Sequence, residues 1–413
     1  MKKIMCLMLA ALLLMSVALA ETGSVVINAE ENRKIKINEA GYNAVPEGVS
    51  PTTGRTLADL TAGLPDTFAG MAKDGQYYPA LVQIDNEEGG TGVYAPWYAS
   101  YADVIYETPL RSNGATRMVM LFNDILPEYC GPCRSLRAHH IALQAEWGCV
   151  YVFHGRQEKY VDALIDKIAK INPDLLYANG YIGLLYSGAD NEYRPYLKNG
   201  LHFRVASPMI SPHNSCFRLA DIMTTVAPRD HAPLNHTYKF TDELPEGGDD
   251  AGFIYVTWEK KSHNNSRLEY DPEENVYYRY LTPEANKSIL YQETAPEFVR
   301  KKKVTDNNGN EQTRYQFDLN PGKAITFSNV IVQYVEMKWT DGGVATPSTP
   351  LGTGNADFFM GGQHYQGVWK RDSLGDRTVF YGTDGNEMPI LRGKTLIIQM
   401  DYKSANHSVS YDP

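Results

Sequence analysis

Two cysteines of the chain have the spacing of a redox motif. Cys130 and Cys133 form Cys-Gly-Pro-Cys within PEYCGPCRSLR, between a predicted strand, TRMVMLFND, and a predicted helix that extends to Trp147. A thiol pair at a helix N-terminus has a lowered pKa, because the positive end of the helix dipole stabilises the thiolate. The motif therefore permits thiol–disulfide exchange. Pro208 and Pro212 are the candidates for the proline-led loop that such a site also needs, but their spacing gives no support for that role.

The first twenty residues indicate the compartment in which these cysteines function. MKKIMCLMLAALLLMSVALA has a basic start, an apolar stretch and a small-residue cleavage signal, which predicts a signal peptide over residues 1–20. Exported proteins retain disulfides, so we expect Cys130 and Cys133 to be oxidised and catalytically idle. Cys149 and Cys216 complete the mature set, and four cysteines allow three full pairings that the sequence does not distinguish.

Charge and hydropathy exclude two classes of partner. The 413 residues carry a formal charge of −10, and removal of the signal peptide with Lys2 and Lys3 changes it to −12. An acidic exported protein is unsuited to nucleic acid. After the signal peptide no apolar run is long enough to span a bilayer. We therefore expect a secreted or cell-envelope associated protein that is soluble after signal-peptide cleavage, with no nucleic-acid partner and no membrane span.

Arginines that follow the cysteines indicate an anion site. Pro132 suits the first position of a helix, whose first turn would present free amides together with Ser135, Arg134 and Arg137. Free amides and guanidinium groups bind a carboxylate or a phosphate. Arg117, at the start of the preceding strand, is a further candidate ligand-binding residue.

The alternative is an internal ion-pair network. Asp85, Asp103 and Glu107 lie in or beside neighbouring predicted strands and are candidates to support or neutralise the arginines. Charged groups inside proteins are commonly paired with one another.

Two histidines are candidates for ligand binding or for catalysis. His154 ends a predicted strand, a common position for site residues in α/β sheets. His213 and Asn214 lie in a predicted turn before another helix, where Asn214 could serve as an N-cap. With Ser135 these histidines would supply a base and a nucleophile, although no G-x-S-x-G motif surrounds the serine. A hydrolase or transferase with His154 or His213 as general base is therefore an alternative function.

No metal or cofactor site is predicted. His139 and His140 could join the other histidines around a metal ion, but the sequence has no HExxH or comparable ligand spacing.

The order of strand-like and helix-like segments predicts an α+β protein with two domains. Strand-like and helix-like runs alternate from Tyr78 to about Val226, which favours an α/β domain with a mixed sheet. Residues 158–171 place Val161, Leu164, Ile165 and Ile168 at the spacing of an amphipathic helix. Beyond a polar stretch rich in proline and glycine, short aromatic and β-branched runs predict antiparallel strands. The expected organisation is an N-terminal extension (21–77), an α/β domain (78–226), a linker (227–250) and a β-rich domain (251–413).

Two hairpins are predicted within the β-rich part. Asp384-Gly385 between RTVFYG and EMPIL is a turn signal. The run Lys301 to Lys303, followed by VTDNNGNEQTRYQF, is interpreted as a solvated hairpin insertion.

Several motifs, in order along the chain, resemble a known family. The motifs are Thr116-Arg117, Gly131-Pro132-x-Arg134-Ser135-x-Arg137, His154-Gly155 and Pro212-His213-Asn214, with SPTTG, VQIDN and ADVIYE among the first strands and SNVIVQ, VWKR, DGNE and GKTLII towards the C-terminus. This set resembles the YerB-like bacterial envelope proteins, a family catalogued as a domain of unknown function with N- and C-terminal parts. The resemblance covers about residues 50–400.

The resemblance implies an envelope location and bears on the cysteines. Members of that family ordinarily have aliphatic residues where Cys130 and Cys133 stand, so the resemblance implies a local variation of Gly-Pro-x-Arg-Ser. Members are commonly lipid-anchored, whereas Glu21 stands here where an anchoring cysteine would follow the signal peptide. Our leading hypothesis is a non-enzymatic envelope protein that binds an anionic cell-wall component, a peptide carboxylate or another envelope protein. The alternatives are the envelope hydrolase or transferase and the CGPC oxidoreductase.

Overall fold

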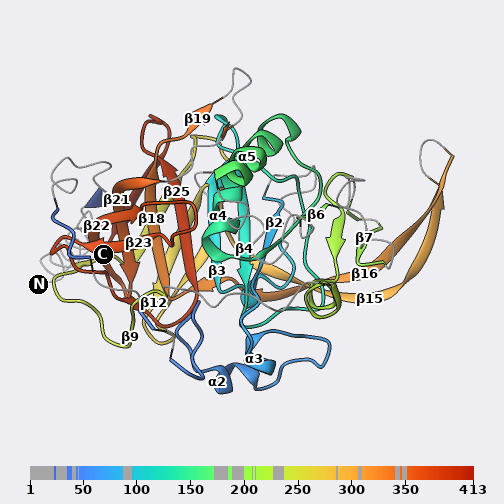
Figure 1. Ribbon diagram of the computed structural model, residues 1–413, viewed down its shortest axis with the longest axis horizontal. Helices are drawn as coiled ribbons and strands as arrows, with labels where there is room; N and C mark the ends of the chain where they lie inside the picture. The colour runs from blue at the N-terminus through green and yellow to red at the C-terminus, as the bar shows by residue number, and fades with distance from the viewer. Residues whose placement is uncertain are drawn as a thin grey trace, which may run out of the picture.

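The protein is described by a computed structural model with an α+β fold in which strands predominate (Figure 1). The structure describes residues 23–24, 35–39, 43–44, 46–86, 95–171, 185–187, 200–206, 208–209, 211–226, 237–284, 287–305, 309–339, 345–346 and 351–413. The predicted signal peptide and residues 227–236 of the predicted linker lie outside these ranges. No helix in the described part of the chain is long and apolar enough to cross a bilayer.

One large mixed sheet forms the centre of the molecule. Its strands are β2 (Ala80–Ile84), β3 (Val104–Pro109), β4 (Thr116–Phe122), β5 (Val150–Phe153), β6 (Leu185–Ser187), β10 (Asp249–Asp250), β18 (Asn329–Val335), β21 (Gly352–Met360), β22 (Gln363–Arg371), β23 (Val379–Gly382) and β25 (Thr395–Asp401). Their order is β10-β22-β21-β18-β25-β3-β4-β2-β5-β6, with β23 beside β22. The inner strands are buried along their whole length, as their near-continuous apolar sequences require.

A second, antiparallel sheet covers one face of the first. It contains β1 (Gly23–Ser24), β26 (Ser408–Asp412), β11 (Phe253–Thr257), β12 (Ser266–Asp271), β13 (Val276–Glu284) and β14 (Lys287–Leu290), and β17 (Thr326–Phe327) pairs with β13. Burial alternates along β11 and β13, so one face of this sheet packs on the core. Ile254 and Leu268 of this sheet share a core with Met120 and Ile398 of the central sheet.

Helices cover the opposite face of the central sheet. Ile141 of α4 (Ala138–Trp147) and Val161 of α5 (Glu158–Ile171) belong to one apolar cluster with Leu121 and Ile397 of the sheet. The predicted helix over residues 158–171 is confirmed. Shorter helical segments are α2 (Leu57–Thr61), α3 (Met71–Asp74), η2 (Ala99–Tyr101), α7 (Leu219–Asp221) and η5 (Ile222–Val226).

A long two-stranded ribbon projects from the body (Figure 1). It consists of β15 (Gln292–Thr305) and β16 (Glu311–Ala324), so the predicted hairpin around Lys301 to Lys303 is confirmed. Phe317 of the ribbon packs with Trp97, Tyr129 and Phe203 at its base. The remaining strand pairs are β7 (His202–Arg204) with β8 (Ser215–Phe217), β9 (Phe240–Thr241) with β24 (Ile390–Leu391), and β19 (Lys338–Trp339) with β20 (Ala345–Thr346).

The two halves of the sequence share the central sheet. Strand β25 of the C-terminal half runs parallel to β3 of the N-terminal half, with Thr395 opposite Val104 and Ile398 opposite Glu107. One sheet, with an apolar cluster on each of its faces, therefore extends across the two stretches of sequence that we expected to form two domains. The predicted domain limits stay a prediction.

Candidate functional site

The segment from Cys130 to Leu136 is extended and not helical. Helix α4 begins at Ala138, with Arg137 as its N-cap, so the expected start at Pro132 is wrong. The reason is that the amides of Cys133 and Arg134 donate to the carbonyls of Ser215 (2.7 Å) and Gln83 (3.0 Å) in neighbouring segments. These amides cannot form the free first turn of a helix, so the anion site predicted at a helix N-terminus does not exist in that form.

Parallel strands bring several of the predicted residues to one edge of the sheet. Asp85 follows β2 and His154 follows β5, and these two strands are parallel neighbours. The amide of His154 donates to the carbonyl of Arg134 at 3.0 Å. The β7–β8 hairpin attaches here through Ser215, which places His213, Asn214 and the adjacent strand β7 beside the same edge.

Asp85 is the buried anchor of this edge. Its carboxylate Oδ2 contacts Nδ1 of His213 and lies 3.5 Å from Nε of Arg134. The Asp85 side chain has no exposed surface, whereas 17% of the Arg134 side chain and 14% of the His213 side chain are exposed. The contact fixes the orientation of the imidazole, whose Nε2 lies on the side away from Asp85.

Arg204 connects Asn214 with His154. Its Nη1 donates to Oδ1 of Asn214 at 3.0 Å, and its Nη2 donates to Nε2 of His154 at 3.1 Å. The His154 ring stacks on His202 with 5.3 Å between the ring centroids. We name Asp85, Arg134, His154, Arg204, His213 and Asn214 together the arginine–histidine cluster.

Arg204 is a cation held by neutral groups. Partial burial, and secondly the nearby positive charge of Arg314, lower the pKa of Arg204. Both side-chain acceptors of its guanidinium, Asn214 and His154, are uncharged when they accept. An anion bound beside this guanidinium would offset both of these unfavourable effects.

Arg117 and Arg137 both lie close enough to His139 to affect its charge. Arg117 is fully buried in β4, and Arg137 donates to the carbonyls of Ser135 (3.2 Å) and Leu136 (3.3 Å). Burial and the two arginines lower the pKa of His139 to about 3, so this ring is neutral. The Ser135 carbonyl accepts from Arg137, and among the described residues no contact supports the proposed role of Ser135 as a nucleophile.

Glu107 is committed to a different partner. It forms a 2.7 Å ion pair with Arg279 of β13, and neither side chain has any exposed surface. Thr116 donates to Glu107 at 2.7 Å, and Asn86 donates to it at 3.2 Å. This buried pair links the two sheets, so Glu107 does not support the predicted arginines.

Asp103 forms part of a buried acidic pair with Asp124. Thr52 donates to Oδ2 of Asp103 at 2.7 Å, while Ser50 and Thr53 donate to the two oxygens of Asp124 at 2.6 and 2.7 Å. Burial, followed by the charge of Asp124, raises the pKa of Asp103 well above its ordinary value. Burial also raises the pKa of Asp124. Asp103 therefore also lies outside the arginine–histidine cluster.

The described cysteines are four free, buried thiols. The predicted disulfide between Cys130 and Cys133 is not formed in the structure. Burial, and then contact with Cys130, raises the pKa of the Cys133 thiol well above its ordinary range. The expected lowering by a helix dipole fails because α4 begins five residues after Cys133. This environment disfavours the thiolate that thiol–disulfide exchange requires.

The histidines considered for a metal site are divided between two places. His139 and His140 both contact Oγ1 of Thr108, at 3.2 and 2.7 Å, whereas His154 and His213 belong to the arginine–histidine cluster. Within the described ranges, no group of three or more histidine, cysteine, aspartate or glutamate side chains is arranged to hold a metal ion.

Sequence comparison defines the class of protein. Residues 68–228 match the N-terminal domain, and residues 254–397 the C-terminal domain, of "Protein of unknown function (DUF3048)". The chain therefore belongs to this family, whose members have two parts.

A solved structure agrees with the family. The chain is similar to the YerB protein from Bacillus subtilis, with a TM-score of 0.56 and 17% sequence identity over 87% of this chain and 99% of that chain. The YerB-like resemblance of the motifs is thus confirmed, and at this identity the likeness concerns the fold. A search of curated proteins finds no match.

Proposed function

We propose that the protein acts in the cell envelope by binding an anionic group, a carboxylate or a phosphate, at the arginine–histidine cluster. The observation that carries this proposal is the position of Arg204, whose guanidinium is half-buried, lies near Arg314 and, among the described residues, donates to the neutral groups of Asn214 and His154. Guanidinium groups recognise carboxylates and phosphates through paired hydrogen bonds. The acidic groups of a cell-wall polymer or a peptide carboxylate have the required chemistry.

The partial exposure of two residues of the cluster also supports the proposal. Arg134 and His213 each keep some exposed surface while Asp85 holds them from the buried side. A ligand that reached this edge would meet side chains already fixed in orientation. Such preorganisation lowers the entropic cost of binding.

Imidazole NMR signals test this proposal at the site itself. Titration with inorganic phosphate or acetate at constant pH should shift the ring signals of His154 and His213 together. The ring of His407, which lies elsewhere against Trp258, should not respond. Arg204→Lys retains the charge but loses the paired donors, and should weaken the response. Shifts that were equal at His407, or unchanged in Arg204→Ala, would contradict the proposal.

The contact between His213 and Asp85 favours a second candidate function. A buried carboxylate that orients one nitrogen of an imidazole is the arrangement of a general base, so a hydrolase or transferase reaction on an envelope substrate is the alternative. His154 fits this role less well because its Nε2 already accepts from Arg204. Hydrolysis of an ester or amide substrate by the wild type, abolished in His213→Asn, would favour the catalytic alternative.

A further inference from the structure

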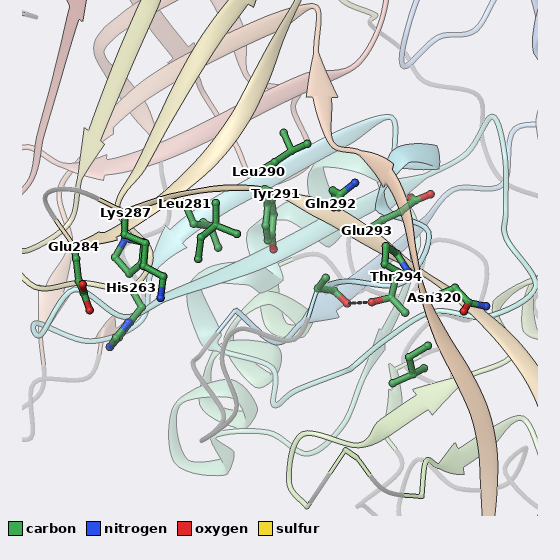
Figure 2. Close-up of a pocket in the computed structure, with 15 residues that line it drawn as sticks. His263, Leu281, Glu284, Lys287, Leu290, Tyr291, Gln292, Glu293, Thr294 and Asn320 are labelled. Carbon is green, nitrogen blue, oxygen red and sulfur yellow. Dashed lines mark hydrogen bonds between the residues drawn. The ribbon is translucent and has the colours of Figure 1, made fainter.

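A cavity of about 470 Å³ lies where the second sheet meets the base of the ribbon. Figure 2 shows side chains from β13, β14, β15 and β16 around it. Its apolar wall includes Leu281, Leu290 and Leu319, and Leu281 and the lining residue Tyr291 both belong to the hydrophobic core. This volume falls within the range of cavities that bind small molecules.

The buried side of the cavity is held in place by hydrogen bonds to the core. Leu281 and Tyr291 are buried, and the Tyr291 hydroxyl donates to Oδ1 of Asn86 at 3.2 Å. Asn86 in turn donates to Glu107, which pairs with Arg279. The Arg279 guanidinium also lies 5.1 Å from the Tyr291 ring centroid. The fully buried ion pair of Glu107 and Arg279 thus holds Tyr291, on the buried side of the cavity, in one arrangement.

Polar groups lie at both ends of the cavity. The two sets differ in how far the protein itself already uses them for hydrogen bonds. Glu293 accepts from the amide of Ser100 at 2.6 Å, and Thr294 donates to the carbonyl of Ala95 at 3.0 Å, so this end is used by the protein itself. At the other end Figure 2 shows Glu284 and Lys287 side by side with His263. Glu284 and Lys287 are both exposed and of opposite charge.

Ile289 lies at the exposed side of the apolar wall. It is 44% exposed, although the neighbouring wall residues Leu281 and Tyr291 are 7% and 3% exposed. Exposed apolar surface beside a cavity is typical of a ligand entrance.

We infer that this cavity binds an amphipathic small molecule, with its apolar body against Leu281, Leu290 and Leu319 and a head group of both charges beside Glu284 and Lys287. The apolar body would remove the exposed surface of Ile289 from water. A zwitterionic head matches the paired opposite charges at the entrance. This inference does not depend on the arginine–histidine cluster, because the two sites share no residue.

The test uses N-phenyl-1-naphthylamine, a neutral apolar fluorophore, with dodecylphosphocholine below its micelle concentration as competitor. The wild type should enhance the fluorescence saturably, and the competitor should displace the dye. Ile289→Asp should weaken dye binding about tenfold or more, because a carboxylate would be desolvated against the dye. Leu351→Asp is the matched control, since Leu351 is an exposed aliphatic residue (42%) that does not line the cavity.

A second variant tests the head group. Lys287→Glu should weaken the competitor while leaving the affinity for the neutral dye unchanged. An unchanged melting temperature, expected because Lys287 and Ile289 are exposed, shows that each variant is folded. The inference is overturned if the wild type gives no saturable enhancement, or if Ile289→Asp and Leu351→Asp bind the dye equally. Equal competition by dodecylphosphocholine in wild type and Lys287→Glu overturns the assignment of the head group.

Discussion

The arginine–histidine cluster and the pair formed by Glu107 and Arg279 both place charged side chains inside the protein, but they differ in exposure. Glu107 and Arg279 have no exposed side-chain surface and lie 2.7 Å apart. In the cluster, Arg134 and His213 keep 17% and 14% of their side-chain surface exposed. A sealed ion pair is a fixed part of the fold, whereas a partly exposed cluster can exchange its water for a ligand.

The two regions also differ in charge balance. Arg279 meets a carboxylate, and Glu107 receives further hydrogen bonds from Thr116 and Asn86. In the part of the chain that the structure describes, the side-chain acceptors of Arg204 are the neutral groups of Asn214 and His154. On our proposal, charge in the sealed pair serves stability, while charge in the cluster is available to an anion.

The largest effect is expected in the sealed pair. Glu107→Ala leaves Arg279 as an uncompensated buried charge and should lower the free energy of unfolding by about 3 to 5 kcal/mol. Urea denaturation measures this loss. The control is Lys303→Ala, which removes an ion pair with Glu311 whose side chains are 75% and 66% exposed and should cost no more than about 1 kcal/mol. If both variants lost the same free energy of unfolding, the buried pair would contribute no more to stability than the exposed pair, and the distinction would fail.

A pH effect is expected from Asp103 and Asp124. Their pKa values are raised in the folded state, so the folded protein retains a proton that the unfolded chain has lost. Stability should therefore fall as pH rises from the ordinary aspartate value of 3.8 to the raised pKa, by up to about 1.4 kcal/mol per pH unit for one proton. Asp103→Asn should flatten this dependence in denaturation curves collected across that window. The assignment would be contradicted if the wild type became more stable as pH rises through that window and Asp103→Asn did not.

A small effect on stability is expected from the cluster. Arg204→Ala removes two hydrogen bonds to neutral acceptors at a half-buried position and leaves no carboxylate without its partner. The free energy of unfolding should change by about 1 to 2 kcal/mol, less than in Glu107→Ala. The same urea titrations compare the two variants. A loss in Arg204→Ala as large as that in Glu107→Ala would mean that the cluster is a structural network.

The strands and the amphipathic helix could be predicted because their patterns are local. Val161, Leu164 and Ile165 have helical spacing whatever surrounds them, and the helix has the predicted limits. The start of α4 could not be predicted in this way. Pro132 suits a first helical turn, but the amides that follow it bond to Gln83 and Ser215, which are distant in sequence.

The predicted site was partly assembled by the fold and partly divided. Asp85, Arg134, His154, His213 and Asn214 come together because their segments meet at one edge of the sheet. Arg204 was missed, although its alternation with His202 on a short strand places both side chains on one face. Glu107 and Asp103 were wrongly expected near the arginines, because their partners, Arg279 and Asp124, are set by tertiary packing that leaves no local signal.

The most direct test of anion binding is the melting temperature of the wild type in phosphate or sulfate, compared with that of Arg204→Ala. A ligand that binds only the folded state stabilises it by about 1.4 kcal/mol at ten times its dissociation constant. Arg300→Ala is the control, because Arg300 is an exposed arginine on the ribbon that likewise donates to a neutral acceptor, Gln316 at 3.0 Å. Its removal changes the net charge by the same amount.

We predict that anions raise the melting temperature of the wild type and of Arg300→Ala in a saturable manner, and leave that of Arg204→Ala unchanged. Sodium chloride at the same ionic strength should not reproduce the increase, because screening acts on all three proteins alike. A wild type whose melting temperature is indifferent to these anions, or an Arg204→Ala variant that gains as much stability as the wild type, would contradict the proposal that this cluster binds an anion.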